Sequence, residues 1–236
     1  MKIKAVLFDL DGTLLPMDFD TFFNDYFGRL AAYLAPHGYE PKVLVDAVMK
    51  GTHAMVKNDG SMTNIERVWS VFNAIFGEGG PRRDRLFESF YAEEFPKIKD
   101  SCGYTPEAAE VVAELKRRGY RVALATSPIF PMVATRQRMD WVGLSPEDFE
   151  FISTYENFSR TKPNLGYYED ALKLLGLRAE ECVMIGNNVA EDMVAEKLGM
   201  HVFLVPRDLI NPKGEDVSRY PCGSLAEAVS YVEQLG

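Results

Sequence analysis

Two acidic residues follow an apolar stretch near the start of the chain, in the run AVLFDLDGTLL from Ala5 to Leu15. Asp9 and Asp11 stand at the end of this run, whose other side chains are those of a buried strand. A carboxylate without a partner costs free energy when it is removed from water. Taken alone, the run fits a turn with a helix cap about as well as a reactive centre. Other parts of the sequence are needed to distinguish these two interpretations.

Polar side chains also follow three later apolar runs. In chain order they are Thr126, Ser127, Lys162, Asn187, Asn188, Glu191 and Asp192. Ligands of an open α/β sheet bind beyond the carboxyl ends of the strands, so we expect these groups to converge with Asp9. Each group alone has a simpler interpretation, as a helix cap or as a solvated loop lysine. Their common position at strand ends favours a site.

Short apolar runs predict the strands that would position these residues. The runs are residues 3–10, 121–126, 149–154, 182–186 and 201–205. They are rich in Val, Ile, Leu and Phe without clear alternation, which is typical of parallel strands covered on both faces. Helical patterns that end in glycine lie between them, at 105–119, 163–176 and 190–199. The alternation predicts a doubly wound, Rossmann-like α/β sheet.

One segment breaks this alternation. From about Asp18 to Asp100 only helices are predicted, over residues 20–36, 41–56, 63–77 and 82–97. The turn-forming stretches PHGYEP, NDGSMT and GEGGP separate them. We therefore expect an α/β core domain of residues 1–17 and 101–236, with an all-helical domain of residues 18–100 inserted after the first strand.

Charge and cysteine content exclude several classes of function. The 236 residues include 26 Lys and Arg and 35 Asp and Glu, a net charge of −9, so neither nucleic acid nor an anionic membrane is an expected partner. Three scattered cysteines, Cys102, Cys182 and Cys222, fit neither a disulfide framework nor a zinc site. With no signal peptide and no run of 18 apolar residues, the sequence predicts a soluble cytoplasmic protein.

The order of DLDGT, ATS, TKP and GNNVAED resembles the four sequence motifs of the haloacid dehalogenase-like (HAD) hydrolases. The match runs from Asp9 to Asp192, and the helical insertion is similar to the cap domain of C1-capped members. The resemblance implies that Asp9 is the nucleophile that becomes an aspartyl-phosphate, and that Asp11 is the general acid and then the base. It implies that Thr126 and Lys162 bind the transferring phosphoryl group.

The resemblance also implies a Mg²⁺ cofactor. Its ligands would be Asp9, the backbone carbonyl of Asp11, Asn187 and Asp192. Many relatives have an aspartate where this chain has Asn187, so we expect weaker metal binding rather than its loss. Around the phosphoryl group, Gly12, Thr13 and Ser127 are further candidates for substrate binding.

The chemistry of these residue types agrees with the resemblance. Carboxylates serve as nucleophiles in phosphoryl transfer, and Mg²⁺ prefers oxygen ligands. A second carboxylate at Asp11 can protonate a leaving group and activate water, which favours a phosphatase or phosphomutase over a dehalogenase. The leading hypothesis is a phosphatase of a small phosphorylated metabolite. A mutase like β-phosphoglucomutase and a non-catalytic binding protein are the alternatives, and the sequence leaves monomer or homodimer open.

The helical insertion offers two further candidates for substrate contact, His53 and Lys57, four residues apart on one helix face. A surface pair is the simpler interpretation. The loop that follows, residues 57–64, is expected to face Asp9. Aromatic residues at helical spacing near residue 25 are interpreted as core rather than as a binding surface. They are Phe22, Phe23, Tyr26 and Phe27.

Overall fold

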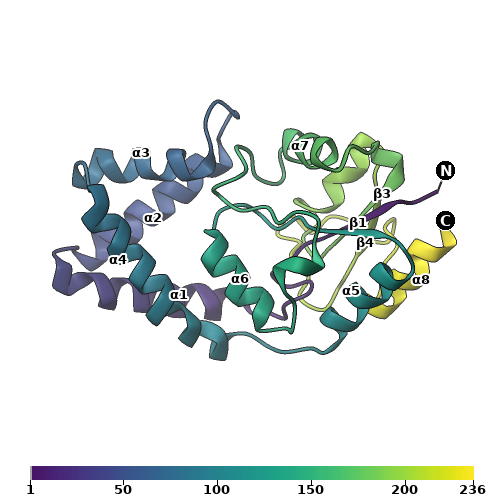
Figure 1. Ribbon diagram of the computed structural model, residues 1–236, viewed down its shortest axis with the longest axis horizontal. Helices are drawn as coiled ribbons and strands as arrows, with labels where there is room; N and C mark the ends of the chain where they lie inside the picture. Colours follow the sequence, from purple (N-terminus) through teal and green to yellow (C-terminus); the bar gives the residue numbers. More distant parts are fainter. Residues whose placement is uncertain (1) are drawn as a thin grey trace.

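The computed structural model describes residues 2–236, with the side chains of residues 81 and 82 excepted. A parallel sheet lies at the end of the molecule that holds both termini, and a group of helices lies at the other end (Figure 1). The sheet has the order β2-β1-β3-β4. Its strands are β1 (Ala5–Phe8), β2 (Arg121–Leu124), β3 (Cys182–Gly186) and β4 (His201–Leu204). The predicted α/β fold with a parallel sheet is confirmed.

Both faces of the sheet are buried because successive side chains of a strand point to opposite sides. From β1, Val6 and Phe8 join the core under α5 (Glu107–Arg117) and α8 (Leu225–Gln234). Ala5 and Leu7 join the core under α7 (Leu165–Leu175) and η5 (Met193–Leu198). The central strand is therefore apolar on both faces, which is why its sequence shows no alternation.

The prediction of a strand over residues 149–154 is wrong. This segment follows the short helix η3 (Pro146–Asp148) and makes a single bridge to the sheet, between Leu124 and Ile152. Its backbone bonds to β2 are few: the Glu150 amide donates to the Val122 carbonyl (2.8 Å), the Leu124 amide to the Phe151 carbonyl (2.9 Å) and the Ser153 amide to the Leu124 carbonyl (3.0 Å). The pairing goes no further, because the side chain of Asn157 binds the next backbone groups: Nδ2 donates to the Ile152 carbonyl (2.9 Å) and Oδ1 accepts from the Thr154 amide (2.8 Å).

Two other elements differ from expectation. The helix predicted over 190–199 is the short 3-10 helix η5 (Met193–Leu198). The loop before it forms a turn instead, in which Asn188 Oδ1 accepts from the amides of Ala190 and Glu191. After the second strand, the chain forms α6 (Met132–Asp140), which carries a residue of the site described below.

The segment between β1 and α5 is helical, and its four α-helices lie within four residues of the predicted boundaries; the last differs most, since it ends at Glu93 and not at residue 97. The helices of the segment are α1 (Phe19–Leu34), η1 (Ala35–His37), α2 (Pro41–Val56), α3 (Asn64–Phe76), α4 (Gly80–Glu93) and η2 (Phe95–Ser101). Asp18 caps α1 by accepting from the Thr21 amide (2.7 Å), and Thr63 with Glu66 forms a capping box on α3. These local signals are why the boundaries could be predicted.

The helical segment contacts the sheet domain at several places, one of them α6, where Gln137 Nε2 donates to the Tyr91 carbonyl (2.7 Å). The start of α3 is bonded to loops beyond the sheet, where Asn64 Nδ2 donates to the Pro128 carbonyl (3.1 Å) and the Ile65 amide to the Tyr155 carbonyl (2.8 Å). Phe130 packs against Phe22 and Tyr26 of α1, with ring centroids 6.2 and 5.5 Å apart. None of the helices in residues 2–236 is long and apolar enough to cross a membrane.

Candidate active site

The turn after β1 brings Asp9 and Asp11 to the carboxyl edge of the sheet. The strand ends at Phe8, two residues before the point at which we expected the chain to leave strand geometry. The turn is closed by bonds from the Gly12 amide to the Leu15 carbonyl (2.7 Å) and from the Leu15 amide to the Leu10 carbonyl (2.8 Å). Gly12 has a φ of 82°, and a Cβ there would overlap the side-chain amide of Asn187. Only glycine at this position therefore allows the side chain of Asn187 to lie so close to the turn.

Lys162 lies between two carboxylates from different strand ends. Its Nζ is 2.7 Å from Asp9 Oδ1 and 2.6 Å from Asp192 Oδ1, and all three side chains are buried. The second oxygen of Asp192 accepts from the Asn188 amide (2.9 Å). A Cβ at Gly186 would overlap the Asp192 carboxylate, so this glycine admits the acid next to the strand. Asp9 and Asp192 therefore meet after β1 and β3, and Lys162 joins them from a loop that follows no strand.

The charges of this cluster do not balance. Two carboxylates face one ammonium, which leaves one negative charge in a buried site. Burial, only partly offset by attraction to Lys162, raises the pKa of Asp192 above its ordinary range. Burial would lower the pKa of Lys162, but the attraction of Asp192 and Asp9 outweighs it and holds that pKa well above its ordinary value. Lys162 therefore stays charged, and a second cation would compensate the negative charge that remains in the cluster.

Asn187 faces the same cluster through its amide oxygen. The Thr13 hydroxyl lies 3.1 Å from Asn187 Oδ1 and 3.3 Å from Asp9 Oδ2. The amide nitrogen of Asn187 donates to the Asp208 carbonyl at 2.5 Å, which fixes the oxygen toward Thr13. Thr13 is fully buried, so its hydroxyl joins the two side chains within the protein.

Asp11 is held by an arginine that we did not predict. Nη1 of Arg138, on α6, forms an ion pair with Asp11 Oδ2, while Asp11 Oδ1 is buried without a hydrogen-bond partner. Arg138 is fully buried, and its Nη2 donates to the Thr135 hydroxyl (3.1 Å). Burial raises the pKa of Asp11 even though Arg138 opposes the shift, and nearby Asp9 raises it further. This environment favours a carboxyl that can carry a proton.

Thr126 and Ser127 follow β2, as the sequence predicted. Thr126 is buried, and its carbonyl accepts from the hydroxyls of Ser153 (2.6 Å) and Tyr167 (3.1 Å). We did not predict that these two hydroxyls would hold Thr126 in place. The Ser127 hydroxyl donates to Glu191 (3.1 Å), and burial raises the pKa of Glu191. These bonds fix the turn after β2 beside the metal-binding loop expected at 187–192.

The structure does not bring His53 and Lys57 to this site. Both are exposed on or just after α2, and neither side chain makes a hydrogen bond or ion pair with the residues that the structure describes. The following loop is bonded to the segment that carries Lys162, since Arg160 Nη2 donates to the Asp59 carbonyl (3.3 Å). A role for His53 and Lys57 in substrate binding stays a prediction.

The oxygen atoms in the cluster fit a magnesium ion. Asp9 and Asp192 supply carboxylates and Asn187 an amide oxygen, which is the kind of donor set that Mg²⁺ accepts together with water and a substrate phosphate. The excess negative charge of the cluster also favours the binding of a metal cation. No group of three or more His, Cys, Asp or Glu side chains in residues 2–236 forms a metal site by itself.

Arg138 is the main residue of the site that sequence reasoning missed. No motif marks it, and it stands in a polar stretch, ATRQRMD. One signal was present, because Arg138 is four residues from both Ala134 and Val142, and these apolar positions share one helix face. A charged residue on the buried face of a helix needs a partner of opposite charge.

Comparison with known proteins identifies relatives over the whole chain. The family model described as haloacid dehalogenase-like hydrolase matches residues 3–198. A glyceraldehyde 3-phosphate phosphatase of Methanothermobacter thermautotrophicus is 26% identical over 92% of this chain and 92% of its own. The enzyme of the same name from Methanocaldococcus jannaschii is 26% identical over 99% and 98%. Among solved structures, a HAD phosphatase from Thermococcus onnurineus has a TM-score of 0.59, covers 98% of both chains and is 19% identical.

Proposed function

The chain belongs to the haloacid dehalogenase-like hydrolases, and on this premise we propose that it is a Mg²⁺-dependent phosphatase of a small phosphorylated metabolite. One observation carries the proposal, the buried ammonium of Lys162 within 2.7 Å of Asp9 and 2.6 Å of Asp192. A fixed cation beside a carboxylate nucleophile can hold a phosphoryl group in place while its charge changes. The name of the two archaeal relatives supports a phosphate monoester as the substrate.

Asp9 is the proposed nucleophile. Lys162 binds Oδ1, and the Thr13 hydroxyl lies 3.3 Å from Oδ2, so the carboxylate is held in one orientation. One of its oxygens attacks phosphorus and displaces the alcohol, which gives an aspartyl-phosphate. Water then attacks the same phosphorus, which releases inorganic phosphate and restores Asp9.

Asp11 is the proposed acid and base. Arg138 holds Oδ2, and Oδ1 is left without a partner, so Oδ1 is the oxygen that can carry the transferred proton. In the first step the proton passes to the leaving oxygen of the alcohol, and in the second step Asp11 takes a proton from the attacking water. A raised pKa suits the first of these tasks, since the acid must be protonated when the substrate binds.

Thr126 and Lys162 are the proposed phosphoryl-binding side chains, and Gly12, Thr13 and Ser127 shape the surrounding pocket. Bound Mg²⁺ would neutralise the substrate's charge beside Asp9, held by Asp9, Asp192, Asn187 and the Asp11 carbonyl. Thr13 touches Asp9 and Asn187 and is buried, so we assign it to orientation of these two side chains rather than to direct contact with substrate.

We further propose that residues 18–100 form a cap domain over a core of residues 1–17 and 101–236. The presence of helices alone between β1 and α5 supports this division. The bonds from Asn64 and Ile65 to the loops after β2 support a position of the helices beside the site. The three free cysteines support a reducing, cytoplasmic location.

The test is hydrolysis of p-nitrophenyl phosphate and of a panel of metabolite phosphates in the presence of Mg²⁺. Asp9→Asn and Asp11→Asn should each reduce turnover by at least about a thousandfold while the circular dichroism spectrum is unchanged. Near-normal turnover by Asp9→Asn would exclude Asp9 as nucleophile. Isomerised sugar phosphate without release of inorganic phosphate would favour the mutase, and inactivity of the unmodified protein on the whole panel would favour a binding protein.

A further inference from the structure

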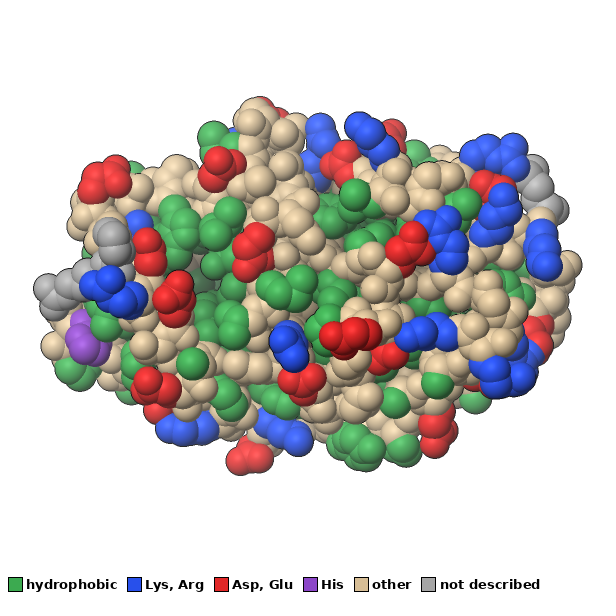
Figure 2. Space-filling model, in the orientation of Figure 1, with side chains coloured by type: hydrophobic (Ala, Val, Ile, Leu, Met, Phe, Trp, Pro, Cys, Tyr) green, Lys and Arg blue, Asp and Glu red, His purple; other side chains and the backbone are tan. Residues whose placement is uncertain are grey.

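A large cavity lies between the helical segment and two loops of the sheet domain. Its volume is about 930 Å³, and it is enclosed by α1 to α4 and by residues 129–133 and 155–156. In Figure 2 it is visible as a hollow lined by hydrophobic side chains, with acidic side chains around its rim. Protein interiors leave few voids larger than a water molecule, whereas small-molecule pockets occupy roughly 300–1,000 Å³. The volume is that of a ligand site.

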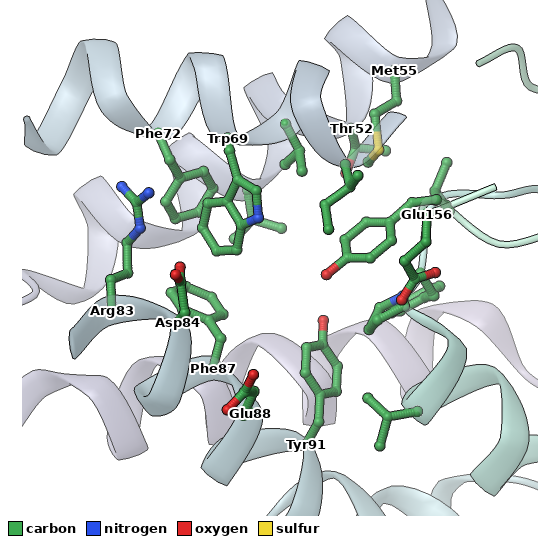
Figure 3. Close-up of a pocket in the computed structure, with 18 of the residues that line it drawn as sticks. Thr52, Met55, Trp69, Phe72, Arg83, Asp84, Phe87, Glu88, Tyr91 and Glu156 are labelled. Atoms are coloured by element: carbon green, nitrogen blue, oxygen red, sulfur yellow. The ribbon is translucent and has the colours of Figure 1, made fainter. Parts of the chain in front are cut away.

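Aromatic side chains form the walls of the cavity. Trp69 stands edge-on to Phe72 and to Phe87, with ring centroids 5.3 Å apart in both pairs, so the rings hold one another in place. Tyr91 extends from α4 toward the open space, and its hydroxyl lies 3.1 Å from that of Tyr26 (Figure 3). Phe23 and Phe27 also line the cavity, so the aromatic residues of α1 that we interpreted as core contribute a binding surface as well.

The charged residues of the cavity are mostly acidic. Asp84 and Glu88 are exposed one turn apart on α4, and Glu156 lies across the opening (Figure 3). Asp84 and Glu88 make no hydrogen bond or ion pair with the residues that the structure describes, although like charges at this spacing repel each other. Burial raises the pKa of the intervening Tyr155 hydroxyl, and the negative charges of Glu156, Asp84 and Glu88 raise it further.

The arginine that lines the cavity does not balance these acids. Arg83 is buried, its guanidinium lies 4.5 Å above the Trp69 ring, and Nη1 donates to Asn73 Oδ1 at 2.7 Å. Within the described part of the chain, Arg83 forms no ion pair with the acids of the rim, and it is outnumbered by Glu78, Asp84, Glu88 and Glu156 in the lining. The result is an aromatic pocket with a negative mouth.

We propose that this cavity binds an organic cation, an amine with an aromatic or aliphatic body. The body would be buried against the rings of Trp69 and Tyr91, and the ammonium would lie at the mouth near Asp84 and Glu88. Aromatic faces attract a cation, and the carboxylates add attraction of the same sign. An anion of the same shape would be repelled by both features.

This site is separate from the site of phosphoryl transfer, so the inference goes beyond the proposed hydrolysis. Asp9, Asp11 and Lys162 do not line the cavity. Phe130 connects the two sites, because it lines the cavity and its ring centroid is 4.5 Å from Cζ of Arg138. A ligand in the cavity would thus touch Phe130, and Phe130 in turn contacts Arg138, the partner of Asp11.

Titration calorimetry of the full chain with three molecules of similar shape tests the proposal. The probes are 2-phenylethylamine, 2-phenylethanol and 3-phenylpropionate, which are cationic, neutral and anionic at pH 7. We expect the amine to bind roughly tenfold more tightly than the alcohol, with the propionate weakest. Equal affinity for the propionate and the amine, or no binding of the amine at millimolar concentration, would overturn the proposal.

Substitutions locate the site. Asp84→Asn combined with Glu88→Gln should weaken amine binding by roughly tenfold and leave alcohol binding unchanged, since exposed charge pairs are worth up to about fivefold each. Asp46→Asn, an exposed acid of α2 that does not line the cavity, is the matched control. Thr52→Phe, which fills space inside the cavity, should abolish binding of both probes while the near-ultraviolet circular dichroism stays that of a folded protein. Unchanged amine affinity in the double variant would place the cation elsewhere.

Discussion

The guanidinium of Arg138 forms an ion pair with the carboxylate of Asp11, which precedes it by 127 positions in the sequence. The pair joins α6 to the turn after β1, and it binds only one oxygen of the acid. Because Asp11 Oδ1 is buried and has no hydrogen-bond partner, the arginine both orients the carboxyl group and leaves one oxygen for proton transfer. Arg138 is thus a positioning residue, acting through Asp11.

The first prediction concerns the stability of this pair. Arg138→Met should lower the free energy of unfolding by about 3–5 kcal/mol, because it leaves a buried carboxylate without its partner. Asp11→Asn combined with Arg138→Met should recover a large part of this loss, since no buried charge remains. Urea denaturation of the two single variants and the double variant measures the coupling. Simple addition of the two single effects would show that the residues do not interact.

The second prediction concerns the lysine shared by two acids. Lys162→Met should reduce phosphatase turnover by about a hundredfold to a thousandfold, because a charge that stabilises the transition state is lost. It should also lower the free energy of unfolding by about 3–5 kcal/mol in the absence of metal, because Asp9 and Asp192 then lose their shared buried cation. Added Mg²⁺ should stabilise the variant more than the unmodified protein.

Lys173→Met provides the control for Lys162→Met. Lys173 is an exposed lysine in the last turn of α7, so its loss should change stability by less than about 0.5 kcal/mol. Turnover of Lys162→Met within tenfold of normal would mean that the ammonium does not act on the phosphoryl group.

The strands and the convergence of polar groups could be predicted because they depend on local patterns. Apolar runs mark buried strands, and residues after parallel strands must meet at one edge. The segment at 149–154 has the same apolar composition and bonds to β2 over a few residues, but Asn157 binds the Thr154 amide and the Ile152 carbonyl, so the pairing is too short to form a strand. Composition cannot show which backbone groups a neighbouring polar side chain will bind.

The partners of the site residues could not be predicted because they come from tertiary packing. Arg138 reaches Asp11 only after α6 has packed beside the turn, and the carbonyl of Asp208 fixes Asn187 from a loop with no motif of its own. The cavity depends on how four helices are spaced, which periodicity does not specify. Phe23 and Phe27 have the spacing of core residues, and only the fold shows that they also face open space.

The third prediction concerns metal affinity. Asn187→Asp should lower the Mg²⁺ concentration for half-maximal activity, because it adds a carboxylate to the donor set. It should also cost about 1–3 kcal/mol of stability without metal, since the bond from Nδ2 to the Asp208 carbonyl is lost and a carboxylate oxygen faces that carbonyl. Measurements of activity and unfolding over a Mg²⁺ titration separate the two effects.

Asn188→Asp is the matched control for this substitution. It adds the same charge one residue away, and its Oδ1 still accepts from the amides of Ala190 and Glu191. We expect a smaller change in Mg²⁺ requirement and little loss of stability. An unchanged or higher Mg²⁺ requirement in Asn187→Asp would show that residue 187 is not a ligand.

The fourth prediction concerns acid stability at the opposite end of the sheet. Glu181 precedes β3, and its Oε1 lies 2.7 Å from Lys4 Nζ while Oε2 accepts from the Arg178 amide at 2.9 Å. These bonds, the one from Lys4 above all, lower the pKa of Glu181 to about 2. A lowered pKa contributes stability that is fully present above the pKa of the unfolded chain, about 4.3, and is lost as the pH falls toward 2.

Glu181→Gln should therefore reduce the free energy of unfolding above about pH 5, and its difference from the unmodified protein should shrink steadily between about pH 4.5 and 2. Glu180→Gln removes the same charge from an exposed neighbour and should show little difference at any pH. Lys4→Met should reproduce most of the effect of Glu181→Gln, because the lysine contributes most to the shift. Urea denaturation at a series of pH values measures all three, and a difference that stays constant down to pH 2 would mean that Glu181 titrates normally in the folded protein.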